Sequence, residues 1–326
     1  MSARAAVPTD LPAVFAVFRG AIAAPSRGIV ASVLPFPYVA AIGDRMTLLR
    51  GAFGVHPHAR LFVEGQGALR ACAVVFVARR PEWVVLLVAA RPDPDGAEGA
   101  FRLVSAVGAA AARAGAERLY AAVPDEPIAR ETFFQAGFYS YTTETWYVAR
   151  RAIDTADAAA PFRTARPADA TDLFRLYVRS TPNAVRRAEQ LSISDFDLER
   201  GAPALLPPHL VDGNPLAMRR GPVLVFEDDR GGLNGIAAAF HGQGAHPHVC
   251  ALHGAGGVDL TRELLRRIAG ALDRQRPIAC PVRPYDDGVA RVLEGEGFAQ
   301  VGAVMLFVKE LAVRAEEPAL AVAPVR

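Results

Sequence analysis

The chain has 326 residues, of which 52% are hydrophobic, and its formal net charge is +2. This much apolar material is enough for two cores of ordinary domain size and excludes general disorder. The near-neutral charge, without dense basic runs carrying interleaved aromatic residues, argues against a nucleic-acid partner. We expect no signal peptide and no membrane span, because no apolar segment is long and uninterrupted enough. Three cysteines without paired spacing are typical of a cytoplasmic protein.

The chain contains an internal duplication. The pattern Arg-x-Ala-x-Pro-x-Asp begins at Arg4 and recurs at Arg163, and the Gly-Phe pair at Gly137 recurs at Gly297. A matched start and a matched end at nearly one spacing predict two homologous domains. The predicted units are a domain over 1–150, a linker over 151–161, a domain over 162–312 and a flexible tail over 313–326.

Periodicity and turn residues predict the same order of elements in both copies: a helix, a β-hairpin, a buried strand, a helix, a strand, a helix and a last strand. Asp10 and Asp169 are expected to cap the first helix of each copy. In the first copy the predicted ranges are 11–19, 60–64 with 68–78, 83–90, 100–114, 118–123, 128–136 and 139–149. In the second copy they are 170–179, 223–227 with 233–241, 248–252, 260–272, 277–282, 288–294 and 299–309.

This order of elements, with a helix that ends in Gly-Phe before the last strand, resembles the GNAT superfamily of acyl-CoA N-acyltransferases. The resemblance covers both halves of the chain. It implies a mixed α/β fold in which each copy is a splayed, mostly antiparallel sheet flanked by helices. It also implies transfer of an acyl group from acetyl-CoA, or another acyl-CoA, to an amine of a small molecule or peptide, without a metal.

In that family the fourth strand runs into a loop of the form V-x-P-x-x-[RQ]-x-x-G-x-[GA], whose amides bind the CoA pyrophosphate. Pro92 and Ala100 match this loop, whereas Asp95 and Glu98 replace its cation and its first glycine. The first copy keeps the family spacing, and the resemblance implies cofactor contacts at Val88, Ala90, Gly96, Gly99 and Ala100. The alternative is that CoA no longer binds this copy, because carboxylates repel phosphates.

The catalytic acid of the family is often a tyrosine, and its position holds Phe133 in the first copy and Leu293 in the second. Tyr141, on the last strand of the first copy, is a candidate replacement, and the alternative is a half-buried strand residue. Glu82, at the start of the fourth strand, is the candidate general base. Its alternative is a solvated turn residue.

The residues His246, His248 and Cys250 alternate along one strand, as zinc ligands can. No second group of ligands has a fitting spacing, so we expect histidines at a strand entrance and no metal. Cys250 and Cys280 are expected to be buried on neighbouring strands.

Two other classes of function stay open at this stage. A catalytically degenerate protein could keep the fold for ligand sensing or dimerisation, because both copies lack the usual acid and the loop is acidic. An aminoacyl-tRNA-dependent transferase would need a basic groove, against which the net charge argues. Either a monomer or a homodimer is compatible with the sequence.

Overall fold

The computed structural model of the protein describes residues 3–34, 58–77, 81–151, 153, 162–199, 218–228, 230–242, 246–254, 257–273 and 275–311. The predicted tail over 313–326 lies outside these ranges, as does the predicted linker over 151–161 except for residues 151 and 153. None of the helices within them is both long enough and apolar enough to cross a bilayer.

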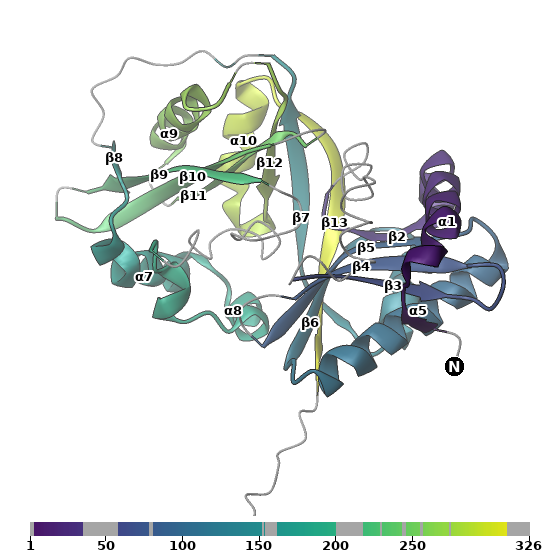
Figure 1. Cartoon of the computed structure of the whole chain (residues 1–326). Coiled ribbons are helices and arrows are strands. Elements are labelled where there is room, and N and C mark those ends of the chain that lie inside the picture. The colour runs from purple at the N-terminus through teal and green to yellow at the C-terminus, as the bar shows by residue number, and fades with distance from the viewer. Residues whose placement is uncertain are drawn as a thin grey trace, which may run out of the picture.

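Both copies have the predicted order of elements (Figure 1). The N-terminal copy contains β1 (Ala3–Ala5), α1 (Leu11–Ala23), α2 (Pro25–Gly28), β2 (Ile29–Ser32), β3 (Ala59–Glu64), β4 (Ala71–Val77), β5 (Glu82–Ala90), α5 (Pro94–Arg113), β6 (Arg118–Pro124), α6 (Pro127–Gln135) and β7 (Tyr139–Ala149). The C-terminal copy contains β8 (Phe162–Thr164), α7 (Ala170–Ser180), α8 (Asn183–Glu189), β9 (Arg219–Glu227), β10 (Leu233–His241), β11 (His248–Gly254), α9 (Val258–Gly270), β12 (Ile278–Val282), α10 (Asp287–Gly295) and β13 (Ala299–Glu310).

The strands form one mixed sheet in the order β1-β3-β4-β5-β6-β13-β7-β12-β11-β10-β9-β8, with β2 beside β5. Among the described strands, only the pairs β5–β6 and β11–β12 are parallel. These two pairs are equivalent: β11 and β12 are the fourth and fifth strands of the C-terminal copy, and β5 and β6 are the fourth and fifth of the N-terminal copy when the additional strand β2 is left out. The predicted mixed α/β class, with a mostly antiparallel sheet flanked by helices, is confirmed.

The two copies exchange their last strands. β13, from the C-terminal copy, pairs with β6 of the N-terminal copy, and β7 pairs with β12 of the C-terminal copy. β7 and β13 also pair with each other, so Glu144 lies opposite Val304, its equivalent in the repeat. The two halves are therefore related by an approximate twofold axis between these two strands, which cross the centre of the molecule in Figure 1.

The exchange carries core side chains across the repeat. Phe307 of β13 is fully buried among residues of the N-terminal copy, with ring centroids 6.0 Å from Phe133 and 5.1 Å from Phe134. Its equivalent on β7, Tyr147, is buried in the core of the C-terminal copy. Each copy thus completes the core of the other.

The repeated Arg-x-Ala-x-Pro-x-Asp pattern forms the same ion pair twice. Two nitrogens of Arg163 donate to the Asp169 carboxylate at 2.7 and 3.0 Å, and Arg4 and Asp10 repeat this at 2.6 and 2.8 Å. Neither carboxylate caps its helix as predicted. Each instead accepts the backbone N–H three residues earlier, which stabilises the turn before the helix.

We expect Asp169→Asn to lower the free energy of unfolding by about 1–3 kcal/mol, because Asp169 is buried and accepts charge-assisted bonds. Burial raises the pKa of Asp169, but the bonds from Arg163 and Arg166 outweigh it and lower this pKa. The contribution should therefore be complete above about pH 4 and disappear as the pH falls through the lowered value. Urea denaturation at pH 7 and pH 3 measures it. Asp172→Asn, in an exposed pair with Arg175, is the control and should change stability little.

Candidate functional site

The parallel strand pairs diverge in both copies, but the two gaps differ. β5 pairs with β6 from Glu82 to Val85, and β11 pairs with β12 only at His248 and Val249. Beyond these residues the strands separate, which leaves one edge of β5 and one edge of β11 facing a gap. Gaps of this kind are places where an extended ligand can bind by main-chain hydrogen bonds.

The gap in the N-terminal copy is filled by the chain itself. β2 pairs with β5, Ile29 opposite Ala89 and Ser32 opposite Leu87, and the amide of Val33 donates to the Leu86 carbonyl at 3.1 Å. Along the equivalent edge of β11, no strand lies within the part of the chain that the structure describes. Among the described residues, the strand edge without a partner strand is therefore that of β11, in the C-terminal copy.

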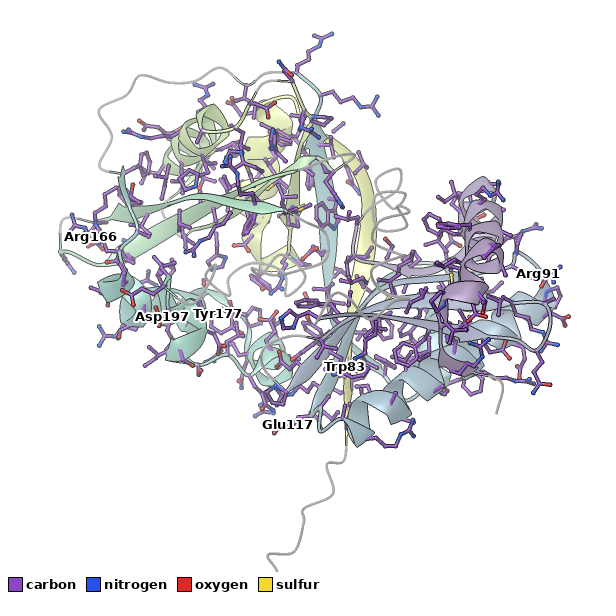
Figure 2. All side chains as sticks on the ribbon, in the orientation of Figure 1. Trp83, Arg91, Glu117, Arg166, Tyr177 and Asp197 are labelled. Carbon is purple, nitrogen blue, oxygen red and sulfur yellow. The ribbon has the colours of Figure 1, made fainter. Side chains whose placement is uncertain are left out.

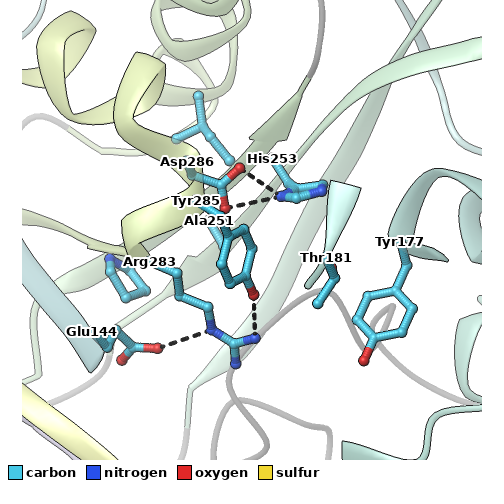
Figure 3. Close-up of a pocket in the computed structure, with 10 residues that line it drawn as sticks. Glu144, Tyr177, Thr181, Ala251, His253, Arg283, Tyr285 and Asp286 are labelled. Atoms are coloured by element: carbon cyan, nitrogen blue, oxygen red, sulfur yellow. Dashed lines mark hydrogen bonds and ion pairs between the residues drawn. The ribbon is translucent and has the colours of Figure 1, made fainter. Parts of the chain in front are cut away.

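Two small cavities lie at the end of β11, one on each face of the sheet. The cavity on the α7 face is lined by Glu144, Tyr177, Thr181, Ala251, Leu252, His253, Pro281, Arg283, Tyr285 and Asp286 (Figure 3). The cavity on the α9 face is lined by Phe162, Phe226, Asn234, Gly235, Leu252, His253, Gly254, Leu260, Thr261 and Leu264. Leu252 and His253 belong to both, so a ligand could reach β11 from either face.

His253 is held between a carboxylate and a hydroxyl. Its Nδ1 lies 2.8 Å and 3.0 Å from the two carboxylate oxygens of Asp286, and its Nε2 contacts the hydroxyl of Ser180. A carboxylate beside Nδ1 favours the tautomer with the proton on Nδ1, which leaves Nε2 able to accept a proton. The side chain is only 7% exposed, so this orientation is fixed by packing. His253 therefore has the geometry of a general base.

Arg283 lies beside this histidine and joins two buried carboxylates. Its guanidinium is 2.8 Å from Glu189 and 3.8 Å from Glu144, and it also donates to the hydroxyl of Tyr285 at 2.8 Å. Burial raises the pKa of Glu144 to about 7, although Arg283 opposes this. Burial also raises the pKa of Tyr285 to about 12, so its hydroxyl keeps its proton at neutral pH. The cavity thus offers a base, a protonated phenol and a charged network.

The residues predicted as catalytic lie elsewhere, at the contact between the copies. Glu82 is 6% exposed and pairs with Arg118 at 3.3 Å, so it is not a solvated turn residue. The ring of Tyr141 packs edge-on against Tyr120 at 6.4 Å. Tyr120 in turn donates to the carbonyl of Ala188 at 2.9 Å. Both predicted residues are thus built into the contact with α8 and line neither cavity.

The predicted cofactor contacts are also placed in the N-terminal copy, where the backbone is already occupied. Val88 pairs with strands on both of its sides, β4 and β2, and Ala90 pairs with β4. The Gly96 amide donates to the Asp93 carboxylate at 2.8 Å, which caps α5, while Ala100 is buried within that helix. Figure 2 shows Arg91, where this loop begins, far from Tyr177 at the C-terminal cavity.

Packing explains the two glycines of that loop. A Cβ on Gly96 would lie 2.0 Å from the Arg91 carbonyl oxygen, and one on Gly99 would lie 2.8 Å from the Arg70 Cβ. Gly96 is required because the helix approaches the backbone of Arg91 closely, and a side chain at Gly99 would collide with side-chain atoms of Arg70 and Glu64. A phosphate is not needed to account for them.

The histidine and cysteine pattern has a structural explanation. Cys250 and Cys280 are fully buried on adjacent strands, as predicted, and burial raises the pKa of both thiols. His246 and His248 lie buried at the start of β11, where His248 Nε2 is 3.0 Å from Asp273. Across the described ranges, no three His, Cys, Asp or Glu side chains form a metal-binding group.

Sequence reasoning missed Ser180, His253, Asp286, Glu144 and Arg283. One signal for three of them was available in the repeat itself. By repeat spacing and strand register, the equivalents of Ser180 and His253 in the first copy are Ala21 and Ala89, and Glu144 of the first copy corresponds to Val304 of the second. Polar residues at positions where the other copy has small or apolar ones indicate a site that belongs to one copy alone.

Comparison with known proteins agrees with the duplication. Neither a protein-family model nor a curated protein sequence matches the chain. A tandem GNAT protein from the clavulanic acid biosynthesis pathway, solved without AcCoA, matches with a TM-score of 0.50 and 15% identity, covering 94% of this chain and 98% of that one. A GCN5-related N-acetyltransferase from Sphaerobacter thermophilus matches with a TM-score of 0.48 and 17% identity, covering 94% and 95%. The likeness to the tandem protein confirms the duplicated GNAT fold that the sequence predicted.

Proposed function

We propose that this protein, which has the duplicated GNAT fold, is an N-acyltransferase that moves an acyl group from acyl-CoA to an amine within its C-terminal copy. The observation that carries the proposal is the edge of β11, which no described strand covers and whose Leu252 and His253 line both cavities. The matching edge of β5 is paired with β2. This favours the C-terminal copy over the first copy, which the loop spacing had favoured.

The C-terminal copy also offers a better fit to a CoA phosphate. α9 begins after Gly257 without a side-chain cap, so the amides of its first turn remain a site for an anion. In the N-terminal copy, the Asp93 side chain already caps α5; each helix has one aspartate in its first turn, Asp259 in α9 and Asp95 in α5. The thioester would then lie along β11. The backbone N–H of His248 points toward β12, and along a strand every second N–H points to the same side. The N–H of Gly254 therefore faces the gap between β11 and β12.

The chain's own groups supply the steps of direct acyl transfer. His253 Nε2 accepts a proton from the acceptor ammonium, and the resulting amine attacks the thioester carbonyl. The Gly254 amide stabilises the oxyanion that forms. The attacking nitrogen loses its second proton to solvent as the C–S bond breaks, and the leaving thiolate takes the proton of the Tyr285 hydroxyl. Solvent restores the Tyr285 proton and takes the proton held by His253. Asp286 stabilises the imidazolium of His253 throughout.

For the N-terminal copy we propose a structural role without catalysis. The alternative of a catalytically degenerate module thus applies to one half of the chain. Its gap is filled, its loop is acidic, and its last strand completes the other copy.

Calorimetric titration with acetyl-CoA should show one site per chain. Gly254→Val should weaken binding at least about tenfold, since a side chain there would fill the cavity on the α9 face. Glu98→Ala, in the loop of the N-terminal copy, is the control and should leave the affinity unchanged. Two equivalent sites, or no binding at millimolar ligand, would contradict the proposal.

A further inference from the structure

The cavity on the α7 face is large enough for one small polar group. Its volume is about 20 Å³, and a space of roughly 10–15 Å³ already holds one water molecule. An ammonium group is close to water in size. The remainder of a ligand would have to extend out of the cavity.

The charges around this cavity do not balance. Glu189 is fully bonded, because Arg283 approaches one of its oxygens at 2.8 Å and the Tyr177 hydroxyl donates to the other at 2.9 Å. Glu144 has a longer 3.8 Å approach of Arg283 to one oxygen, together with a side-chain hydrogen bond from Trp146. Its other oxygen, Oε1, has no hydrogen-bond partner among the described residues, and the side chain is 1% exposed. A buried carboxylate oxygen without a donor is costly, so this oxygen is suited to accept a bond from a ligand.

The carboxylate is present only on β7, the exchanged strand that completes the C-terminal copy. Val304 occupies the equivalent position of β13, and it lines a cavity of the N-terminal copy together with Pro124 and Val301. The fold therefore does not require an acid at this position. A buried, half-bonded acid where the fold accepts valine indicates a functional role.

We propose that the cavity beside Glu144 binds the ammonium group of an aliphatic primary amine, the acceptor, through hydrogen bonds to Glu144 Oε1. This inference rests on the proposed function, because it names the substrate class of the same site. Glu144, Glu189 and Asp286 outnumber the single guanidinium of Arg283, which Glu144 and Glu189 already engage, while Asp286 is paired with His253. The site therefore selects against amines that carry a carboxylate beside the ammonium group, such as α-amino acids.

The ionisation of Glu144 gives the site a pH dependence. Burial raises its pKa to about 7, opposed by Arg283 and Trp146 and reinforced by Glu189. The other titratable groups around the cavity are Tyr177 on α7, His253 on β11, and Tyr285 and Asp286 after β12. A cation binds the deprotonated carboxylate, so amine binding below pH 7 must release the Glu144 proton. Affinity should fall by up to about tenfold for each pH unit below 7 and level off above it.

Calorimetry on the full chain, without acyl-CoA, tests the proposal with butylamine and with norvaline, which adds an α-carboxylate to the same carbon chain. We expect butylamine to bind at pH 8 at least about tenfold more tightly than norvaline. Glu144→Gln should weaken butylamine at least about tenfold while keeping the shape of the side chain. Glu126→Gln, which alters a carboxylate lining the N-terminal cavity, is the matched control and should leave the affinity unchanged.

Equal binding of both ligands, or unchanged butylamine affinity in Glu144→Gln, overturns the inference. If Glu144→Gln does not fold, the wild-type protein decides, since an affinity that does not fall between pH 7 and pH 6 also overturns it. A parallel acetyl-CoA titration separates the two proposals. If the amine binds but acetyl-CoA does not, the cation site is retained and the acyltransferase proposal is rejected. If acetyl-CoA binds but the amine does not, only the cation site is rejected.

Discussion

Replacing His253 with alanine should lower kcat for acyl transfer by about 10²–10⁴-fold, the usual contribution of a positioned general base. The reason is that Nε2 of His253 is the group oriented to take the amine proton, with Nδ1 fixed by Asp286 at 2.8 Å. Affinity for acetyl-CoA should change much less, because the side chain acts on the acceptor. Steady-state kinetics with a saturating amine, together with calorimetry of acetyl-CoA, measure the two effects separately.

Glu82→Gln is the decisive comparison for His253→Ala. The sequence offered Glu82 as a candidate base, with a solvated turn residue as the alternative, whereas the structure pairs it with Arg118 at the contact between the copies. We expect kcat in Glu82→Gln to stay within about threefold of wild type, provided that the variant remains folded. A large loss in Glu82→Gln with little change in His253→Ala would return the catalytic site to the N-terminal copy.

Phe307→Ala should lower the free energy of unfolding by about 3–5 kcal/mol, as for other fully buried phenylalanines. The informative result is which copy of the repeat is destabilised. Phe307 belongs to the second copy in sequence but packs against Phe133 and Phe134 of the first. Urea denaturation measures the loss, and hydrogen exchange should show faster opening of β5 and β6 in the N-terminal copy.

Ile128→Ala is the control for this substitution, because Ile128 lies on α6 but is 57% exposed. It should change stability by no more than about 0.5 kcal/mol. If Phe307→Ala leaves exchange in β5 and β6 unchanged and affects only the C-terminal copy, the last strands are not exchanged in solution.

At the start of α5, the spacing of the family loop and the local helix signals point to different structures. The sequence predicted a phosphate-binding loop followed by a helix from residue 100, but the helix begins at Pro94. Asp93 followed by Pro94 is an N-cap with proline in the first turn, which is a strong local start signal. The segment fits the family loop in its spacing, whereas its side chains, Asp93 and Pro94, are those that begin a helix.

The strand exchange could not be read from the sequence. Both last strands were predicted over nearly their observed ranges, and both end in an aromatic residue followed by valine, Tyr147 and Phe307 in the same register. Because the two strands are equivalent in pattern and length, either could pair with either fifth strand. Which pairing forms depends on contacts between residues far apart in sequence.

The sequence by itself determined the duplication, the order of elements and the fold class, because repeats, periodicity and turn residues are local properties of the chain. Only the tertiary structure decided which copy has the open strand edge and which side chains meet there. Ser180, His253 and Asp286 come from three separate elements and meet only after the sheet and α7 have packed. Catalytic geometry of this kind is a property of packing between distant segments, and no spacing along one segment encodes it.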